Sequence, residues 1–265
     1  MIQPRRANSL DKEARCIIRY LKETQLIGPM ASFVFSPAWF IGKDILIDLF
    51  SFFTLLLIAY FSYRFYRINT ANRKYLYLSG GFLLLAGSFL AKITTLLIIY
   101  YYQVLHIREF PIIVDFIDIT IQGIRPSYLF FFLGFTLFRF AHLLGLYLLY
   151  ITYQDKRSLS DIVIITISFF MITYFSHNTY FAFHLMSFVL LVLMTYRYGQ
   201  VYAKNMRSNT LALAISFGII AVSQAVFMFQ TNPLLYVTAE VIQLIGYFLL
   251  LYTFITILRH GKKKK

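Results

Sequence analysis

Long apolar runs are the feature that most constrains the fold of this chain. A helix needs about 20 mostly apolar residues to cross a bilayer. Runs that meet this need lie at 37–63, 76–101, 127–152, 161–176, 179–196, 209–229 and 234–257. Inside the hydrocarbon every backbone polar group must find a partner within the protein, and a helix supplies one for each group. We therefore predict an all-α polytopic membrane protein, a bundle of seven transmembrane helices.

The composition agrees with a membrane protein. Hydrophobic residues make up 59% of the chain and charged residues 14%, whereas a soluble domain has about 25% charged residues. We assign residues 1–36 to an N-terminal tail, 37–258 to the transmembrane domain and 259–265 to a basic tail. The lipid bilayer is the main partner that we predict.

The basic residues predict the orientation of the chain. One set of alternate loops contains only Arg108 and Arg125. The other set, with the tail, contains Arg64, Arg67, Arg73, Lys74, Lys156, Arg157, Arg197, Lys204, Arg207, Arg259 and Lys262 to Lys265. Cytoplasmic loops are enriched in Lys and Arg, so we predict a cytoplasmic C-terminus and, with seven spans, an N-terminus outside. Because this charge is divided among short loops, the net charge of +14 does not indicate a nucleic-acid partner.

The N-terminal tail is harder to place. Residues 9–24, SLDKEARCIIRYLKET, have the pattern of an amphipathic helix, but their basic side chains fit poorly outside the membrane. The tail lies outside despite this charge, or residues 26–40 form an eighth membrane segment, or translation begins at Met30. Mass spectrometry of the N-terminal peptide tests the last alternative. Cys16 is the sole cysteine, which excludes an internal disulfide and a cysteine-based metal site.

The segment 103–127 is the one long connection on the predicted outer side. Its stretch FPIIVDFIDITIQGIRPS is too apolar for a free loop. An interfacial helix, a strand-like flap and an extended start of the third span all fit its pattern. We expect it either to lie on the membrane surface or to cover an outward-facing cavity as a lid.

Polar side chains within the spans are the candidate functional residues, because such groups are costly in a bilayer and usually face the bundle interior. They are Asp48, Lys92, Arg139, His142, His184, Gln224, Glu240 and Gln243. At 1.5 Å per residue, Asp48, Lys92 and Glu240 lie about 10 to 16 Å below the outer surface, and Arg139 lies about 18 Å deep. Nearly all of them fall in the outer half of the bundle. This distribution predicts an outward-facing polar pocket with Arg139 near its floor.

A purely structural role competes with that interpretation. Asp48 with Lys92, and Arg139 with Glu240, have opposite charges at similar depths and would serve as interhelical ion pairs. His142 is expected to be a hydrogen-bonded interior residue rather than a ligand. His142 and His184 differ in depth, which disfavours them as axial haem ligands. We therefore expect no cofactor.

Catalytic and metal-binding motifs are not evident in the sequence. It contains no zinc-binding His pair of the H-E-x-x-H type, no G-x-S-x-G nucleophile elbow and no lysine in the last span for a retinal Schiff base. No internal repeat is evident either, which disfavours the transporter folds that are built from repeats.

Two stretches carry a resemblance to a known class. They are YRFYRINTANRKYLYLSGGFLLLAGSF at 63–89 and AEVIQLIGYFLLLYTF at 239–254. They resemble the seven-helix membrane sensor modules of prokaryotic histidine kinases and diguanylate cyclases, and stand-alone relatives of those modules. The resemblance implies a sensory function in a prokaryotic plasma membrane. Such sensors continue into a kinase or cyclase domain, whereas this sequence ends at RHGKKKK, so the resemblance implies output through a cytoplasmic signalling partner.

Three functions therefore compete. The first is a sensory, receptor-like module without its own output domain, which binds a small molecule or a proton from outside in the polar pocket. The second is a transporter or permease, which requires a polar path that continues to the cytoplasm. The third is an enzyme of lipid or isoprenoid metabolism, which requires a metal or nucleophile that the motifs do not reveal.

Overall fold

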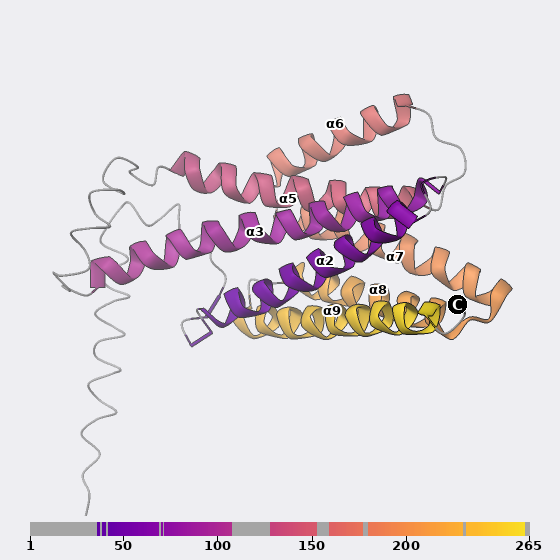
Figure 1. Cartoon of the computed structure of the whole chain (residues 1–265). Coiled ribbons are helices and arrows are strands. Elements are labelled where there is room, and N and C mark those ends of the chain that lie inside the picture. Colours follow the sequence, from indigo (N-terminus) through magenta and orange to yellow (C-terminus); the bar gives the residue numbers. More distant parts are fainter. Residues whose placement is uncertain are drawn as a thin grey trace, which may run out of the picture.

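The computed structural model describes residues 36–107, 128–152, 159–176, 180–229 and 232–262, apart from positions 38, 41, 69 and 71. These residues form helices and turns without any strand, which confirms the all-α prediction for this part of the chain (Figure 1). The helices are α2 (Lys43–Ile68), α3 (Lys74–Ile107), α5 (Tyr128–Ile151), α6 (Leu159–Phe175), α7 (Tyr180–Asn205), α8 (Ser208–Phe227) and α9 (Pro233–Lys262). The predicted amphipathic helix at 9–24 lies outside the described residues, as does most of 26–40 and of 103–127.

Six of the helices are long and apolar enough to cross a membrane, and α6 is the exception. Its 17 residues extend about 26 Å, which is short of the hydrocarbon thickness of about 30 Å. Its apolar part, Ile162–Phe175, is shorter still. The prediction of a multi-pass membrane protein is therefore supported by six helices.

Capping residues mark the starts of three helices. Asp44 Oδ1 accepts hydrogen bonds from the backbone N–H groups of Gly42 and Ile45 at the start of α2. Asn72 Oδ1 accepts from the N–H of Lys74, and Asn232 Oδ1 accepts from the N–H of Leu234. These acceptors satisfy N–H groups that have no partner within the helix. The first span was predicted to start at residue 37, but α2 starts at Lys43, after a turn in which Gly42 has a φ of 85°.

The helices alternate in direction along the chain (Figure 1). The Ser79 hydroxyl donates to the carbonyl oxygen of Ala59, and Lys92 further along α3 pairs with Asp48 nearer the start of α2, so the two helices are antiparallel. Successive aromatic pairs from Phe132–Tyr174 to Phe140–Phe170 place α6 antiparallel to α5. Since α7 runs opposite to α6, α5 and α7 point the same way. In chain order, α6 therefore runs antiparallel to both of its neighbours, α5 and α7, which are parallel to each other.

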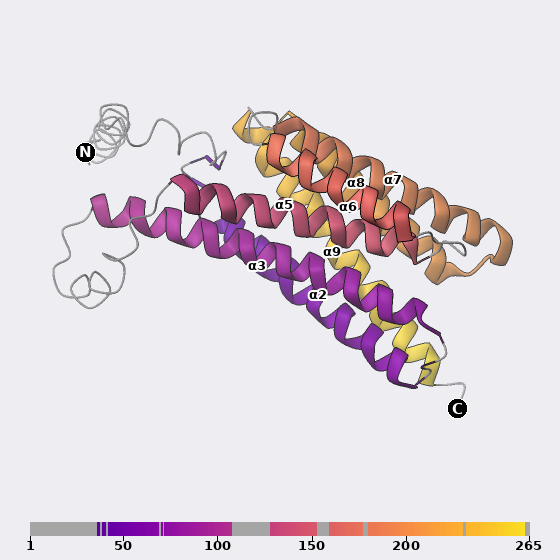
Figure 2. The same cartoon turned by 90° about the horizontal axis from the view of Figure 1, so that it is seen from above.

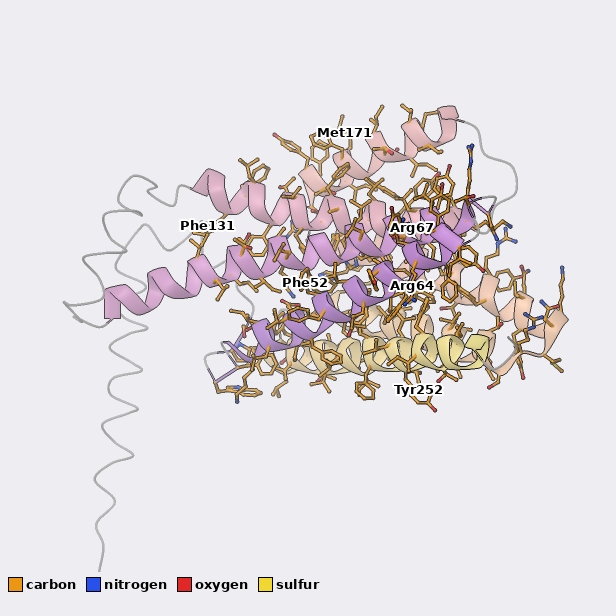
Figure 3. All side chains as sticks on the ribbon, in the orientation of Figure 1. Phe52, Arg64, Arg67, Phe131, Met171 and Tyr252 are labelled. Carbon is orange, nitrogen blue, oxygen red and sulfur yellow. The ribbon has the colours of Figure 1, made fainter. Side chains whose placement is uncertain are left out.

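The long helices form two rows of three. In the first row α3 packs between α2 and α5, and in the second row α8 packs between α7 and α9. Contacts of α2 with α9 and of α5 with α7 join the rows, while α6 lies outside them against α5 (Figure 1). Figure 2 shows α3 between α2 and α5. Buried Leu, Ile and Phe side chains fill the interior. Large apolar side chains also cover the outer faces, as expected for surfaces in contact with lipid (Figure 3).

Glycines allow α3 and α5 to approach closely. A Cβ atom on Gly145 would lie 3.0 Å from the carbonyl oxygen of Gly81 and 2.9 Å from Leu85 Cγ. Small residues at such crossings let helix backbones meet in a membrane, where van der Waals packing is a main source of association. The crossing of α8 and α9 is built in the same way, with Gly246 against Ile220.

Candidate functional site

All the candidate residues that the sequence predicts are described by the structure, and nearly all are buried. Seven of the eight have at most 5% of their surface exposed, and the side chain of Lys92 is 14% exposed. Asp48, Lys92, Arg139 and His142 belong to the first row, and His184, Gln224, Glu240 and Gln243 belong to the second. The predicted residues therefore meet where the two rows face each other.

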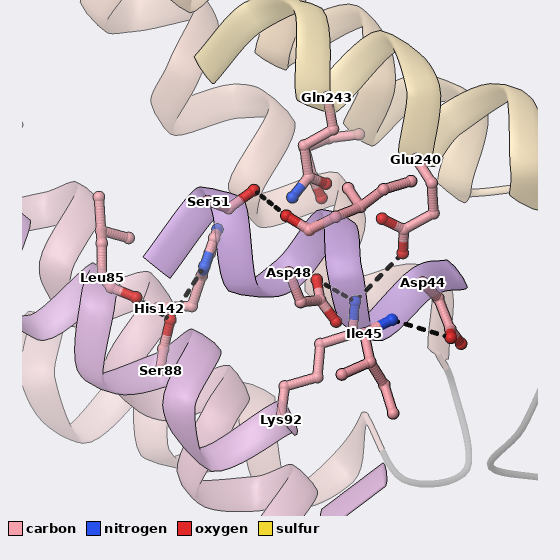
Figure 4. A network of polar contacts seen from close by, with 12 residues as sticks. Asp44, Ile45, Asp48, Ser51, Leu85, Ser88, Lys92, His142, Glu240 and Gln243 are labelled. Carbon is pink, nitrogen blue, oxygen red and sulfur yellow. Dashed lines mark hydrogen bonds and ion pairs between the residues drawn. The ribbon is translucent and has the colours of Figure 1, made fainter. Parts of the chain in front are cut away.

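Lys92 forms ion pairs with two carboxylates from different helices (Figure 4). Its Nζ lies 2.9 Å from Asp48 Oδ1 on α2 and 3.1 Å from Glu240 Oε1 on α9. Both carboxylates are 0% exposed. Their second oxygens, Asp48 Oδ2 and Glu240 Oε2, have no hydrogen-bond partner among the described residues. We call these three residues the carboxylate–lysine cluster.

A chain of amides and a histidine continues from this cluster through the second row. Gln243 lies one helical turn after Glu240 on α9, and Gln224 Nε2 donates to Gln243 Oε1 at 3.5 Å. Gln224 Oε1 lies 2.8 Å from His184 Nδ1 on α7. The turn of α9 that contains Glu240 and Gln243 therefore links both groups of polar residues.

His142 occupies an aromatic environment between the rows. Its Nδ1 lies 3.4 Å from the Ser88 hydroxyl, and its ring contacts Phe89, Phe138 and Phe183 at centroid distances of 5.7 to 5.9 Å. This arrangement agrees with the prediction of a hydrogen-bonded interior histidine. Lys92 Nζ lies 5.9 Å from the centroid of Phe138, so an aromatic ring of this environment also contacts the cation.

The predicted pairing of Arg139 with Glu240 is wrong. Glu240 pairs with Lys92, and Arg139 Nη1 donates to the hydroxyl of Ser176 at the end of α6, at 3.0 Å. The reason is that α5 packs against α3, α6 and α7, whereas α9 packs against α8 and α2. The predicted Asp48–Lys92 pair is confirmed.

Sequence reasoning missed Ser176 and Phe138. Ser176 follows the last residue of α6, and a polar residue directly after a short apolar span is a signal that would have identified it. Phe138 precedes Arg139 in an aromatic-rich stretch, and nothing in the sequence distinguishes it from its neighbours. The outward-facing pocket stays a prediction.

Comparison with known proteins identified no relative of this chain. No protein-family model, no curated protein and no solved structure matches this chain. Within the described ranges, no group of three or more His, Cys, Asp or Glu side chains is placed to hold a metal ion.

A double-mutant comparison tests the corrected pairing. Asp48→Asn and Glu240→Gln should be strongly coupled, with an interaction energy above about 0.5 kcal/mol, because both carboxylates share Lys92. Arg139→Gln and Glu240→Gln should be additive within about 0.5 kcal/mol, because Glu240 pairs with Lys92 whereas Arg139 donates to Ser176. The free energy of unfolding in mild detergent, measured for single and double variants, gives both interaction energies. A strong coupling of Arg139 to Glu240 would restore the original pairing.

Proposed function

We propose that the protein is a sensory, receptor-like protein of a prokaryotic plasma membrane, and that it responds to a proton or a small monovalent cation at the carboxylate–lysine cluster. The observation that carries this proposal is the composition of the cluster. Two buried carboxylates share one ammonium group, and two of their oxygens are without a hydrogen-bond partner in the described part of the chain. The signal passes to a cytoplasmic partner through the basic end of the bundle.

The charge of the cluster supports a cationic ligand. An uncompensated charge in a low-dielectric interior is costly, and acidic residues in membrane helices typically mark proton or ion sites. With both carboxylates ionised, the cluster has one negative charge more than Lys92 balances. A proton or a monovalent cation at Asp48 Oδ2 and Glu240 Oε2 removes this excess and gives the two oxygens a partner.

The topology of the proposed sensor has seven spans, with α6 as the short one. Support comes from the equal directions of α5 and α7, since a chain that crosses along both must return between them. Most of the described basic residues at helix ends, among them Arg64 and Arg67, lie at the end of the bundle where α7 meets α8 (Figure 3), whereas Lys43 at the start of α2 lies at the opposite end. The positive-inside rule assigns that end to the cytoplasm. The carboxylate–lysine cluster, near the starts of α2 and α9, then lies toward the outside.

Thermal melting in detergent tests the response. A cation that binds the folded protein and not the unfolded chain raises the melting temperature, by the equivalent of about 2.7 kcal/mol at 100 times its Kd. We expect this rise when pH is lowered at fixed sodium, or when sodium is raised at fixed pH, and the two titrations distinguish a proton from a metal cation.

Two variants make the result specific. Glu240→Gln should lose the response, because it removes one carboxylate of the cluster without changing its shape. Thr70→Lys makes the same change in net charge at an exposed position and should keep the response. If Glu240→Gln melts with the same cation dependence as the original protein, the cluster is not the sensing site.

A transporter is the second candidate, favoured by one observation. The polar residues lie between two rows of helices, and transporter substrates bind at such interfaces near the middle of the membrane. Toward the basic end, however, the buried hydroxyls of Thr152 and Thr253 bond to their own helix backbones among apolar side chains such as Leu250. Flux of the matching cation in proteoliposomes would favour transport over sensing.

A further inference from the structure

We propose that the first row (α2, α3 and α5) and the second row (α7, α8 and α9) are two copies of one three-helix unit, and that the Lys92–Glu240 ion pair is a latch between the copies. The evidence for the duplication does not depend on the function proposed above. The opening of the latch by a cation rests on the function proposed above.

The first helices of the two rows share a sequence pattern. DLFSFFTLLLIAY at 48–60 and HLMSFVLLVLMTY at 184–196 are identical at six of thirteen positions when they are aligned without gaps. The alignment places Asp48 over His184 and Ser51 over Ser187, and all four of these residues are buried. The two candidate residues that the sequence analysis found separately thus occupy one position of the repeat.

The second helices match in sequence and in a local hydrogen bond. LYLSGGFLLLAGS at 76–88 and LALAISFGIIAVS at 211–223 are identical at five of thirteen positions. The alignment places Ser88 over Ser223, and each hydroxyl donates to the carbonyl oxygen three residues earlier, at 2.7 Å. Most other helical Ser and Thr residues of the described chain bond four residues back, as Thr95 does.

The third helices match through their polar pair and glycine. RFAHLLGLYLLYIT at 139–152 and EVIQLIGYFLLLYT at 240–253 are identical at five of fourteen positions. Gly145 aligns with Gly246, and each lies at a crossing with the second helix of its own row. Gly145 faces Leu85 and Gly246 faces Ile220, and Leu85 and Ile220 are themselves aligned in the second helices. The alignments of the second and third helices therefore agree in three dimensions.

The buried faces follow the same register. In the second helices, aligned residues such as Phe82 and Phe217 are buried together, while Gly87 and Val222 are exposed together. The third helices differ at Tyr147 and Ile151, which are buried where their equivalents Phe248 and Tyr252 are exposed. Tyr147 contacts Phe169 of α6, and no described helix corresponds to α6 beside α9. The difference at Tyr147 thus follows from α6.

The odd number of helices in the unit explains the presence of α6. A unit of three membrane-crossing helices ends on the side of the membrane opposite to its start. A second copy in the same orientation therefore needs one further crossing between them, and α6 supplies it. For this reason α6 has no equivalent among the described helices and lies outside both rows (Figure 1).

The repeat predicts two equivalent seams, α2 with α9 and α5 with α7, and the structure contains both. The ion pair of Asp48 with Lys92 in the first row corresponds to the stacked rings of His184 and Phe227 in the second, whose centroids are 5.1 Å apart. Glu240 corresponds to Arg139. The contacts are therefore conserved between the rows while the chemistry differs, and the carboxylate pair belongs to the α2–α9 seam.

Lys92 thereby becomes a connection between the copies. It pairs with Asp48 of its own row and with Glu240 of the other row. A cation that binds the carboxylates competes with Lys92 for Glu240 and weakens the pair that crosses the seam. The α2–α9 seam then loosens, while the helices within each row keep their packing.

A segment exchange tests the duplication. The substitutions Met186→Phe, Val189→Phe, Leu190→Thr, Val192→Leu, Met194→Ile and Thr195→Ala give residues 185–196 of α7 the sequence of residues 49–60 of α2 in the proposed register, with His184 kept. We expect this protein to remain monodisperse and folded. The same α2 segment placed one residue later rotates its faces by about 100° and should abolish folding. Equal behaviour of the two exchanges would overturn the duplication.

Cross-linking tests the latch in the full chain, with Cys16→Ser as the background. Phe50→Cys with Phe248→Cys reports on the α2–α9 seam, where these rings stack at 6.1 Å. Ala59→Cys with Ser79→Cys reports on contacts within the first row. We expect Glu240→Gln to lower the disulfide formation rate at the seam, relative to the pair within the row, by about fivefold or more, the lower range of couplings between sites.

The cation titrations are then repeated on the cross-linking proteins. A relative rate at the seam that falls with the same proton or sodium concentration that raises the melting temperature supports opening by the ligand. If Glu240→Gln leaves the relative rate unchanged, the latch is refuted even where the melting response is present. If Glu240→Gln lowers the rate but no cation does, the latch stands and the proposed cation response fails.

Discussion

Lys92→Met should leave little folded protein. The substitution removes the one ammonium group that Asp48 and Glu240 share and leaves two carboxylates facing each other in a buried place. Removing one partner of a buried ion pair costs about 3 to 5 kcal/mol, which is a large part of the stability of a typical domain. Size-exclusion chromatography of detergent-solubilised protein and its melting temperature measure the loss.

The charge explanation is tested by a rescue. Asp48→Asn and Glu240→Gln, added to Lys92→Met, replace all three charges by neutral groups of similar volume and should restore most of the folded yield. Lys74→Met removes the same side chain at an exposed position of the same helix and should change the stability by less than about 0.5 kcal/mol. If the triple variant stays unfolded while Lys74→Met folds, lost packing of the lysine side chain, and not charge, explains the defect.

Gly145→Ala should destabilise the protein strongly, although less than Lys92→Met. The added Cβ atom meets the Gly81 carbonyl oxygen at 3.0 Å and Leu85 Cγ at 2.9 Å, and the backbone oxygen cannot move aside without shifting α3. Overpacking of this kind costs about 1 to 3 kcal/mol. The melting temperature should fall accordingly, and Gly246→Ala should show a similar fall because its Cβ atom meets Ile220 Cγ1 at 2.5 Å and the backbone nitrogen of Ile220 at 3.3 Å.

Gly87→Ala is the matched control for both glycine variants. It lies in α3, and a Cβ atom added there meets nothing within 4 Å. Because alanine favours a helix more than glycine does, this change should leave the melting temperature unchanged or raise it. A fall equal to that of Gly145→Ala would mean that the glycines act through helix flexibility and not through the crossing.

The sequence predicts the helices and the buried polar residues, because both predictions need only the residues of a single span. The length of an apolar run predicts a membrane helix, and the position of a polar residue along that run predicts its depth in the membrane. The partners of each residue depend also on which way a helix faces and on which helices are neighbours. Arg139 and Glu240 have similar depths, but their helices belong to different rows. A prediction from depth and charge therefore paired the wrong residues.

The repeat was invisible in the sequence for a related reason. Leu, Ile and Phe dominate every span, so identities such as Leu55 with Leu191 stand out little from the background. The structure adds the burial of each position and the crossing points of the helices. These select one register in each pair of helices, and Ser88 with Ser223 then shows the same hydroxyl geometry. Position along the chain also hides the match, because residues 108–127 separate α3 from α5 in the first row, whereas only five residues separate α8 from α9 in the second.

In the seven-span topology proposed above, the short length of α6 affects the lipid around the protein. Its apolar part, Ile162–Phe175, extends about 21 Å, whereas the neighbouring bilayer has a hydrocarbon layer of about 30 Å. A span that is too short makes the bilayer thin locally or draws its polar flanks inward. Since α6 lies outside the two rows, this mismatch falls on one flank of the molecule. In the proposed seven-span topology the protein therefore deforms its membrane asymmetrically, and thinner bilayers should accommodate the α6 flank at lower cost than thick ones.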